Sequence, residues 1–274
     1  MSGTAWWVAA SLLAAAGMGR AARADEAPAA APPPVDKVSH TELRVCADPS
    51  NLPYSNDKQE GFENKIAQRV AQDLGETLSF TWFPDSQGFA RATLFRRRCD
   101  VIIGTVEDAP DLRTTKPYYQ SGYVLVSRTA DNIKSTSLGD PALQGARFGL
   151  IASTPPTDLL LQHNLLARTH FYPLVVDTRV DQPAHQMLLD VVDKTIDVGL
   201  AWAPVAGYYI KHDHLKLTTV PLDPENRKFF RIKIAMGVRP SDKLFMARLN
   251  DVLAKDKPAI DKILADYGIP LFDK

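Results

Sequence analysis

The sequence holds few of the residues that metal sites and common catalytic motifs require. Only two of its 274 residues, Cys46 and Cys99, are cysteines. A structural zinc site normally takes four cysteine or histidine ligands, so the two cysteines do not suffice by themselves. The sequence also contains no glycine-rich phosphate loop, no H-E-x-x-H motif and no G-x-S-x-G motif. We therefore expect no metal site, no cofactor and no hydrolase of these common types.

An excess of charge of one sign is also missing. The chain has 32 Lys and Arg residues and 32 Asp and Glu residues, for a formal net charge of zero. Nucleic-acid binding or attachment to an anionic membrane therefore has no general electrostatic support. The one basic run, Arg96–Arg98, lies at the end of a predicted helix. Cations at that position face the negative end of the helix dipole, which is sufficient reason for the run.

Long hydrophobic runs are confined to the N-terminus. Residues Trp6–Met18 are apolar and rich in alanine, but the run is too short to span a membrane comfortably. Ala22-Arg23-Ala24 then offers a small-x-small cleavage site, so we predict a signal peptide over 1–24, although no basic residue precedes the apolar run. An uncleaved membrane anchor is the less favoured alternative. Residues 25–40 are predicted to form a flexible linker, and the mature chain to be periplasmic without a transmembrane segment.

The remaining sequence alternates strands with helices. Leu43–Asn56 runs from an apolar strand into a polar loop, and Gly61–Gly75 is an amphipathic helix that ends at a glycine. Cys99–Arg113 is a buried strand followed by another polar loop, and Lys116–Arg128 is apolar again. We predict a helix between these strands at Ser86–Arg98. This alternation is typical of an α/β layer structure.

The second half of the chain continues the alternation. Strands are predicted at Arg147–Ala152, Leu174–Val176, Thr195–Ala201, Leu215–Val220 and Arg231–Val238. Helices are predicted after a Thr154 cap, at Gln186–Lys194, and in two parts over Lys243–Tyr267.

The Pro-Tyr loop, the Gly-Phe helix entry and the D-V-I-I-G-T strand resemble the type II periplasmic solute-binding proteins. The resemblance implies an α/β fold of two lobes joined by two hinge crossings, here near Arg128 and near Phe230, with a ligand cleft between the lobes. It places lobe one at 41–129 plus 228–274, and lobe two at 130–227. In that fold the strands of Cys46 and Cys99 are neighbours. A disulfide is the favoured state for an exported chain, and two buried free thiols are the alternative.

In amino-acid-binding members of that family, an arginine after the G-T loop grips the ligand carboxylate, and an acid in lobe two receives the amine. Arg113 occupies the first position, where a structural tie to a nearby acid is an equal alternative. Val106 and Asp108 replace the small hydroxyl residues of that loop, and Trp202 falls where the acid is expected. We therefore predict that standard amino acids do not bind and that Arg113 faces Trp202 across the cleft. The predicted cleft residues are Asp48, Asn51, Tyr54, Thr105, Asp108, Arg113, Thr154 and Trp202.

Catalytic alternatives have little support. His212-Asp213-His214 is a possible metal pair, but no third ligand is evident and a solvated loop is favoured. Some dehydratases use the same fold, which leaves an enzyme as a third hypothesis.

A closer resemblance rests on two segments of the second lobe. The V-x-D-T-R segment at Val175–Arg179 and the segment Asp197–Tyr209, together with the first-lobe motifs, resemble the MxaJ/XoxJ family. These are accessory proteins of pyrroloquinoline-quinone (PQQ) methanol dehydrogenases. The resemblance implies a non-catalytic periplasmic protein that binds and helps to mature or activate such a dehydrogenase. It leaves open whether the cleft holds a small ligand, a peptide segment of the partner or nothing. A transport receptor for a small organic solute is the alternative.

Overall fold

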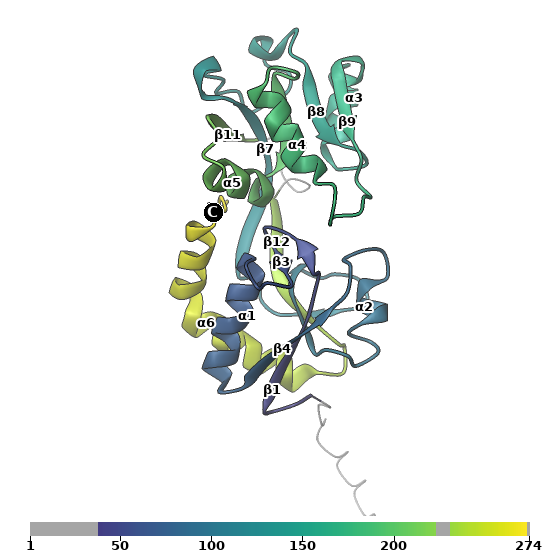
Figure 1. Ribbon diagram of the computed structural model, residues 1–274, viewed down its shortest axis with the longest axis vertical. Coiled ribbons are helices and arrows are strands. Elements are labelled where there is room, and N and C mark those ends of the chain that lie inside the picture. Colours follow the sequence, from purple (N-terminus) through teal and green to yellow (C-terminus); the bar gives the residue numbers. More distant parts are fainter. Residues whose placement is uncertain (1–37, 223–230, 273–274) are drawn as a thin grey trace, which may run out of the picture. The chain divides into compact units, whose positions relative to one another are not determined.

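The computed structural model describes residues 38–222 and 231–272. Its strands form one continuous hydrogen-bonded path in the order β4-β1-β5-β12-β7-β10-β8-β9, with β11 and β6 paired off that path (Figure 1). Short strands β2 (Ser50–Asn51) and β3 (Ser55–Asn56) form a separate pair. No helix within the described ranges has the length and apolar character needed to cross a membrane.

The first lobe is built on β1 (Glu42–Ala47), β4 (Thr77–Trp82), β5 (Val101–Val106) and most of β12 (Arg231–Val238). Helices α1 (Phe62–Leu74) and α6 (Lys243–Asp266) lie side by side against it (Figure 1). The predicted stripe of α1 is buried at Ile66 and Val70, and Gly75 ends the helix in the left-handed conformation, at φ 69°.

The second lobe carries β8 (Phe148–Ile151), β9 (Thr169–Tyr172), β10 (Val198–Trp202) and β11 (Leu217–Pro221). Its helices are α3 (Pro156–Gln162), α4 (Pro183–Val192) and α5 (Ala203–His212). Single 3-10 turns occur at Thr129–Asp131, Pro141–Leu143 and Leu166–Arg168. Met187, Leu188 and Val191 are fully buried, so α4 supplies much of this core.

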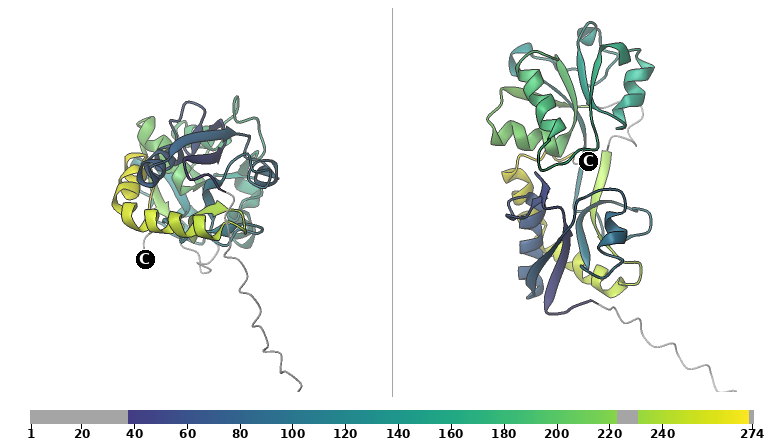
Figure 2. Two further views of the ribbon diagram at one scale, coloured as in Figure 1. Left: turned by 90° about the horizontal axis from the view of Figure 1, so that it is seen from below. Right: turned by 45° about the vertical axis from the view of Figure 1, so that its right-hand side comes forward.

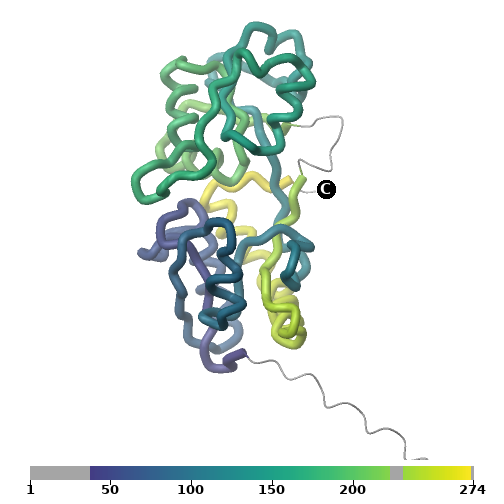
Figure 3. Tube along the Cα trace, turned by 90° about the vertical axis from the view of Figure 1, so that its right-hand side faces the viewer, coloured from purple at the N-terminus to yellow at the C-terminus, as the bar shows by residue number. Residues whose placement is uncertain are grey.

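Strand β7 (Tyr119–Arg128) belongs to both lobes. Its first residues, Tyr119 to Gly122, pair with β12, and residues from Tyr123 onward pair with β10 and β11. Figures 2 and 3 show β7 beside β12, although the two strands are far apart in the sequence. The change of sheet therefore lies at Gly122–Tyr123, earlier than the predicted crossing near Arg128. The second predicted crossing, near Phe230, lies outside the described residues.

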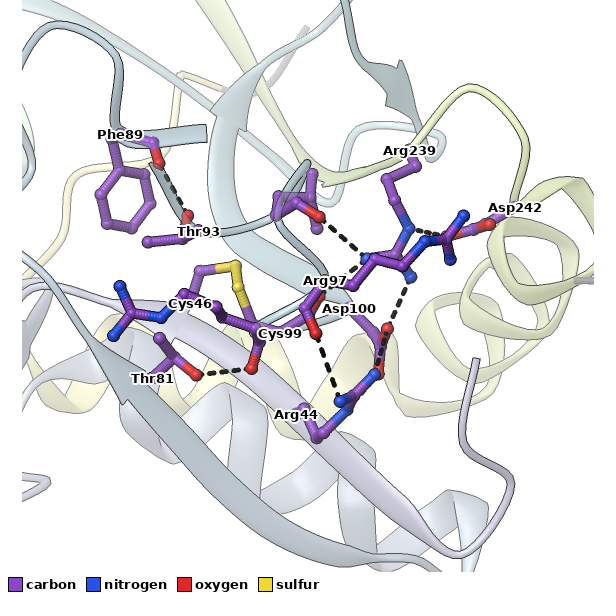
Figure 4. The surroundings of a disulfide bond; sticks show 12 residues. Arg44, Cys46, Thr81, Phe89, Thr93, Arg97, Cys99, Asp100, Arg239 and Asp242 are labelled. Atoms are coloured by element: carbon purple, nitrogen blue, oxygen red, sulfur yellow. Dashed lines mark hydrogen bonds and ion pairs between the residues drawn. A yellow bond between two sulfur atoms is a disulfide. The ribbon is translucent and has the colours of Figure 1, made fainter. Parts of the chain in front are cut away.

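A disulfide joins Cys46 to Cys99, with the two Cα atoms 5.4 Å apart (Figure 4). Cys46 lies on β1, and Cys99 lies just before β5, which pairs with β1 in parallel. The predicted disulfide is therefore confirmed, and free thiols are not found among the described cysteines.

Some predicted elements were wrong. The helix predicted over Ser86–Arg98 is only α2 (Phe89–Ala92), because Gly88 enters it at φ 92° and the chain turns after it, with Arg97 at φ 56°. The strand predicted at Leu174–Val176 is absent, and Val175 is 89% exposed. Leu174-Val175-Val176 is a short run of consecutive apolar residues, and so short a run does not by itself determine the secondary structure.

Two helix predictions differ in detail. The C-terminal tail is one continuous helix, α6, that contains Pro258, where two parts were predicted. Thr154 does not cap α3. Its hydroxyl donates to the carbonyl of Ile151, at 2.6 Å, so the oxygen faces back toward β8.

Candidate functional site

A cavity of about 300 Å³ lies where the second lobe meets the β2–β3 loop of the first lobe. Its wall is mostly aromatic and aliphatic, and we call it the aromatic cavity. Its lining residues are Ser50, Asn51, Leu52, Tyr54, Tyr123, Ile151, Thr154, Pro173, Leu174, Val176, Thr178, Asp181, Gln182, Pro183, Ala184, His185, Met187, Leu200, Trp202, Val205 and Tyr209. No lysine or arginine is among these described residues, so an anionic ligand would find no cation on this wall.

Trp202 is central to the aromatic cavity. It stands at the end of β10, directly before α5, and is half-buried. Its ring contacts Tyr123 edge to face, with centroids 5.5 Å apart. It packs against the core of both lobes. Trp202 is therefore a contact between the lobes as well as a cavity wall.

Tyr54 is the first-lobe partner of Trp202. Burial and the nearby carboxyl of Glu63 raise the pKa of Tyr54, while a hydrogen-bonding contact with the side chain of Trp202 opposes the rise. Burial likewise raises the pKa of Tyr123, to about 12, and a hydrogen-bonding contact with Thr154 opposes that rise. All of these phenols are neutral at physiological pH, so they offer hydrogen bonds and apolar surface and no charge.

A second cavity, of about 250 Å³, lies inside the first lobe behind Tyr54. We call it the acidic cavity, because Asp48, Glu63 and Asp85 line it. Burial and the charge of Asp85 raise the pKa of Glu63 to about 8. Glu63 therefore holds a proton at neutral pH unless a cation enters.

Local structure explains how these acids reach one space. Asp48 follows β1, where its carboxylate accepts hydrogen bonds from the backbone amides of Ser50, at 2.7 Å, and Asp85, at 2.5 Å. Glu63 is in the first turn of α1 and lies over Gly104 of β5. A Cβ at position 104 would come within 1.9 Å of the Glu63 carboxyl oxygen. Position 104 therefore requires glycine, because any larger residue would clash with the Glu63 carboxyl group.

The structure divides the predicted cleft residues among different places. Asn51, Tyr54, Thr154 and Trp202 line the aromatic cavity, and Asp48 lines the acidic cavity. Thr105 lines a third cavity, which shares Asp85, Phe89, Ile102 and Gly104 with the acidic cavity.

Arg113 does not face Trp202, and that prediction was wrong. Arg113 lies on β6 (Arg113–Thr114), which pairs with the end of β12 at Val238, and its side chain donates to the carbonyl of Pro240 at 3.1 Å. Asp108 is exposed on the preceding loop. The chain reverses between these residues, at Asp108 with φ 57° and Asp111 with φ 66°, and this carries Arg113 away from both cavities.

Sequence reasoning missed several lining residues. Glu63 was treated only as a helix residue, although it directly follows the Gly-Phe entry. His185 was missed as well. Its ring stacks on Tyr209, with centroids 4.2 Å apart, and its Nε2 lies 2.7 Å from a carboxylate oxygen of Asp213. Only the fold brings α4 and α5 together, so no local pattern could have found this pair.

The His212-Asp213-His214 segment forms no metal group in the described part of the chain. Asp213 instead contacts His212 through one oxygen, at 2.6 Å, and His185 through the other. These contacts lower the pKa of Asp213 in spite of the opposing effect of its partial burial. The carboxylate therefore holds two imidazole rings in place beside the aromatic cavity.

Known proteins resemble this chain in sequence and in fold. Protein MoxJ of Methylorubrum extorquens is 31% identical over 248 residues, which are 84% of this chain and 81% of that protein. The crystal structure of the periplasmic binding protein XoxJ from Methylobacterium extorquens AM1 is 38% identical, covers 85% of this chain and 100% of its own, and superposes with a TM-score of 0.72. The crystal structure of MxaJ from Methlophaga aminisulfidivorans MPT is 26% identical and covers 84% of this chain and 100% of its own. It also superposes with a TM-score of 0.72.

The chain is thus homologous to MoxJ, XoxJ and MxaJ over most of its length. The fold is the α/β type II periplasmic binding protein fold, as predicted. Residues 43–268 match the model of bacterial extracellular solute-binding proteins, family 3, and the chain belongs to that family.

Proposed function

We propose that this protein is a non-catalytic periplasmic accessory protein that binds a PQQ-dependent methanol dehydrogenase and helps to mature or activate it. The proposal draws on the resemblance to the MxaJ/XoxJ family and on the homology to MoxJ, XoxJ and MxaJ. The observation that carries it is the wall of the aromatic cavity, which contains Trp202, Tyr123 and Tyr209 and, among the described lining residues, no lysine or arginine.

Such a wall suits a protein partner better than an amino acid. Tryptophan and tyrosine supply a large share of the binding energy at protein interfaces, because they bury much apolar area and keep a polar tip. Trp202, Tyr123 and Tyr209 provide this surface, and Thr154 and Gln182 provide polar contacts at its margin. An apolar side chain of a partner protein fits this chemistry.

The rim of the cavity supports the same proposal. The loop between β9 and α4, residues 173–182, carries Leu174 at 54%, Val175 at 89% and Val180 at 77% exposure. Apolar side chains gathered on an exposed loop beside an apolar cavity are typical of a surface that a partner covers. The Val175–Arg179 segment that carried the family resemblance is part of this loop.

The proposal can be tested on Trp202. We expect Trp202→Ala to weaken binding of purified methanol dehydrogenase about 30-fold, or ~2 kcal/mol, as for a central interface tryptophan. Biolayer interferometry with immobilised dehydrogenase measures it.

Trp82→Ala is the matched control, because Trp82 is also half-buried but stacks on Phe80 in the first lobe and lines neither cavity. In cells lacking the gene, we expect reduced dye-linked methanol oxidation that is restored by the wild type and by Trp82→Ala, but not by Trp202→Ala. Unchanged oxidation in the deletion strain, with no binding in vitro, would reject the proposal.

The acidic cavity favours a second candidate function, namely a receptor for a small cationic organic solute. An entering cation would be met by Asp48 and Asp85 and would favour ionisation of Glu63. Calorimetry with lysine and with cadaverine, which has the amines of lysine but no carboxylate, distinguishes this function. Tight binding of cadaverine together with weak dehydrogenase binding would favour the receptor.

A further inference from the structure

A turn on the first lobe presents a cluster of exposed arginines. Arg96, Arg97 and Arg98 are exposed, and so is Arg91 on α2 close by. In the described part of the chain, none of these four guanidinium groups forms an ion pair with a carboxylate. We define residues 94–99 as the arginine turn, and we infer that it is a docking site for an acidic segment of a protein partner.

The helix-dipole explanation offered by the sequence does not apply to this turn. Helix α2 contains only Phe89–Ala92 and ends before the three consecutive arginines. Helices this short have little dipole, and the effect is lost beyond the last turn. The positions of Arg96, Arg97 and Arg98 therefore need another reason.

The backbone of the arginine turn is held from several directions (Figure 4). Arg239 donates to the carbonyls of Leu94, at 3.0 Å, and Cys99, at 2.7 Å. The hydroxyl of Thr81 donates to the carbonyl of Arg98, at 2.7 Å. The Cys46–Cys99 disulfide fixes the end of the turn. A fixed backbone reduces the ordering entropy that binding would otherwise cost.

The arginines that support the turn are themselves neutralised. Arg44 and Arg239 both pair with Asp100, at 2.7 Å and 2.5 Å, and Arg44 also donates to the carbonyl of Arg97. The charges that remain available are those of the exposed arginines. Arg44 and Arg239 thus have a structural role, whereas the exposed arginines of the turn remain available to a partner.

A protein carboxylate is the partner group that fits best. The planar guanidinium forms paired hydrogen bonds with a carboxylate. The chain has a formal net charge of zero, so its overall charge gives no general support for binding to nucleic acid or to an anionic membrane.

A cavity of about 350 Å³ beside the turn adds a place for an apolar side chain. Arg91 and Phe95 line it, and Phe95 is 36% exposed. Asp85 and Asp111 line the same cavity, so the carboxylates of the partner belong over the arginines rather than inside it. The inferred partner segment is acidic and carries an apolar residue next to its acids. This inference does not depend on the identity of the partner in the proposed function.

The test uses a fluorescent synthetic peptide of glutamates with one central leucine, and the same peptide with glutamines. We expect the wild-type protein to bind the glutamate peptide, more weakly as salt rises, and to bind the glutamine peptide much less. Arg96→Gln/Arg97→Gln/Arg98→Gln should weaken binding about tenfold, since three exposed ion pairs are lost. Fluorescence anisotropy measures the affinities.

A matched control removes the same charge elsewhere. Lys58, Lys134 and Lys216 are exposed and have no ion-pair partner among the described residues, and their triple glutamine variant should retain peptide binding. If the arginine variant unfolds, Arg96→Glu/Arg98→Glu spares the left-handed Arg97 and should weaken binding further. Equal losses in the arginine and lysine variants would overturn the inference. So would tighter, arginine-dependent binding of anionic vesicles or duplex DNA than of the peptide.

Discussion

The aromatic cavity and the acidic cavity share Asn51 and Tyr54 but differ in almost everything else. One has a wall of tryptophan, tyrosine and aliphatic residues, mostly from the second lobe. The other is enclosed by the first lobe and contains three carboxyl groups. Tyr54 separates a space that favours apolar groups from a space that favours cations.

The difference shows how the residues that line a cavity decide which kind of ligand or partner the same fold can bind. A ligand that bridges two lobes needs complementary groups on both. Here the first lobe has Asp48 and Asp85 after its strands, and the second lobe offers Trp202 at the end of β10 and the carboxylate of Asp181, but no lysine or arginine lines either the aromatic or the acidic cavity. The carboxylate of a small zwitterion would therefore be left unpaired, and that costs several kcal/mol.

The largest expected effect comes from the disulfide that borders the acidic cavity. Cys46→Ala/Cys99→Ala should lower the free energy of unfolding by about 4 kcal/mol, because the bond closes a loop with a sequence separation of 53. Urea unfolding measures this loss, and thiol titration of unreduced wild-type protein should detect no free thiol.

The same variant tests whether the two cavities are independent. Cys46 lines the acidic cavity and not the aromatic one. The folded double variant should therefore bind methanol dehydrogenase as the wild type does. Equal loss of stability and of dehydrogenase binding would mean that the two cavities act as one unit.

A smaller effect is expected from Glu63. Its folded-state pKa of about 8 lies above its ordinary value of 4.5, so the folded protein keeps a proton that the unfolded chain releases. The contribution of Glu63 to stability is therefore complete below pH 4.5 and is lost progressively as the pH rises to about 8. Glu63→Gln should remove this loss and raise the free energy of unfolding by ~1–3 kcal/mol relative to wild type as the pH rises between those limits, less than the full shift because the Glu63 side chain is partly exposed to solvent.

Urea midpoints across that pH range measure the effect of Glu63→Gln. Glu42→Gln is the control, since its carboxyl lies on β1 outside both cavities. A pH dependence that is the same in wild type and Glu63→Gln would show that the carboxyl is solvated and that the acidic cavity holds no neutral acid.

The parts of this fold that were predicted from sequence depend on short-range patterns. The stripe on α1, the apolar run of β5 and the paired strands of Cys46 and Cys99 each follow from local periodicity or from the resemblance. The helix predicted over Ser86–Arg98 failed because a turn with left-handed Arg97 interrupts it, and the forces that hold that turn come from Thr81 and Arg239, far away in sequence.

Prediction of the candidate site was also limited by contacts between residues that are far apart in the sequence. Trp202 and Tyr54 were predicted because each follows a strand, and the carboxyl ends of strands meet at one edge of a sheet. Arg113 was predicted by the same reasoning and was wrong, because two left-handed residues in its loop turn it toward Pro240. His185 and Tyr209 meet only through the packing of α4 on α5, and no spacing in the sequence reports that packing.

The smallest expected effect is a null result in binding experiments with the standard amino acids. We expect no binding of the twenty standard amino acids at sub-micromolar concentration, because no lysine or arginine lines the aromatic cavity or the acidic cavity and Arg113 is held at Pro240. A ligand carboxylate that entered would lose its hydration without gaining a guanidinium partner, and the unpaired charge would remove the affinity of a transport receptor. Isothermal titration calorimetry measures this. A control titration with methanol dehydrogenase shows that the same preparation is active in binding. One tight exothermic titration with an amino acid would contradict the prediction, and repeating it with Trp202→Ala and Glu63→Gln would show which of the two cavities holds the ligand.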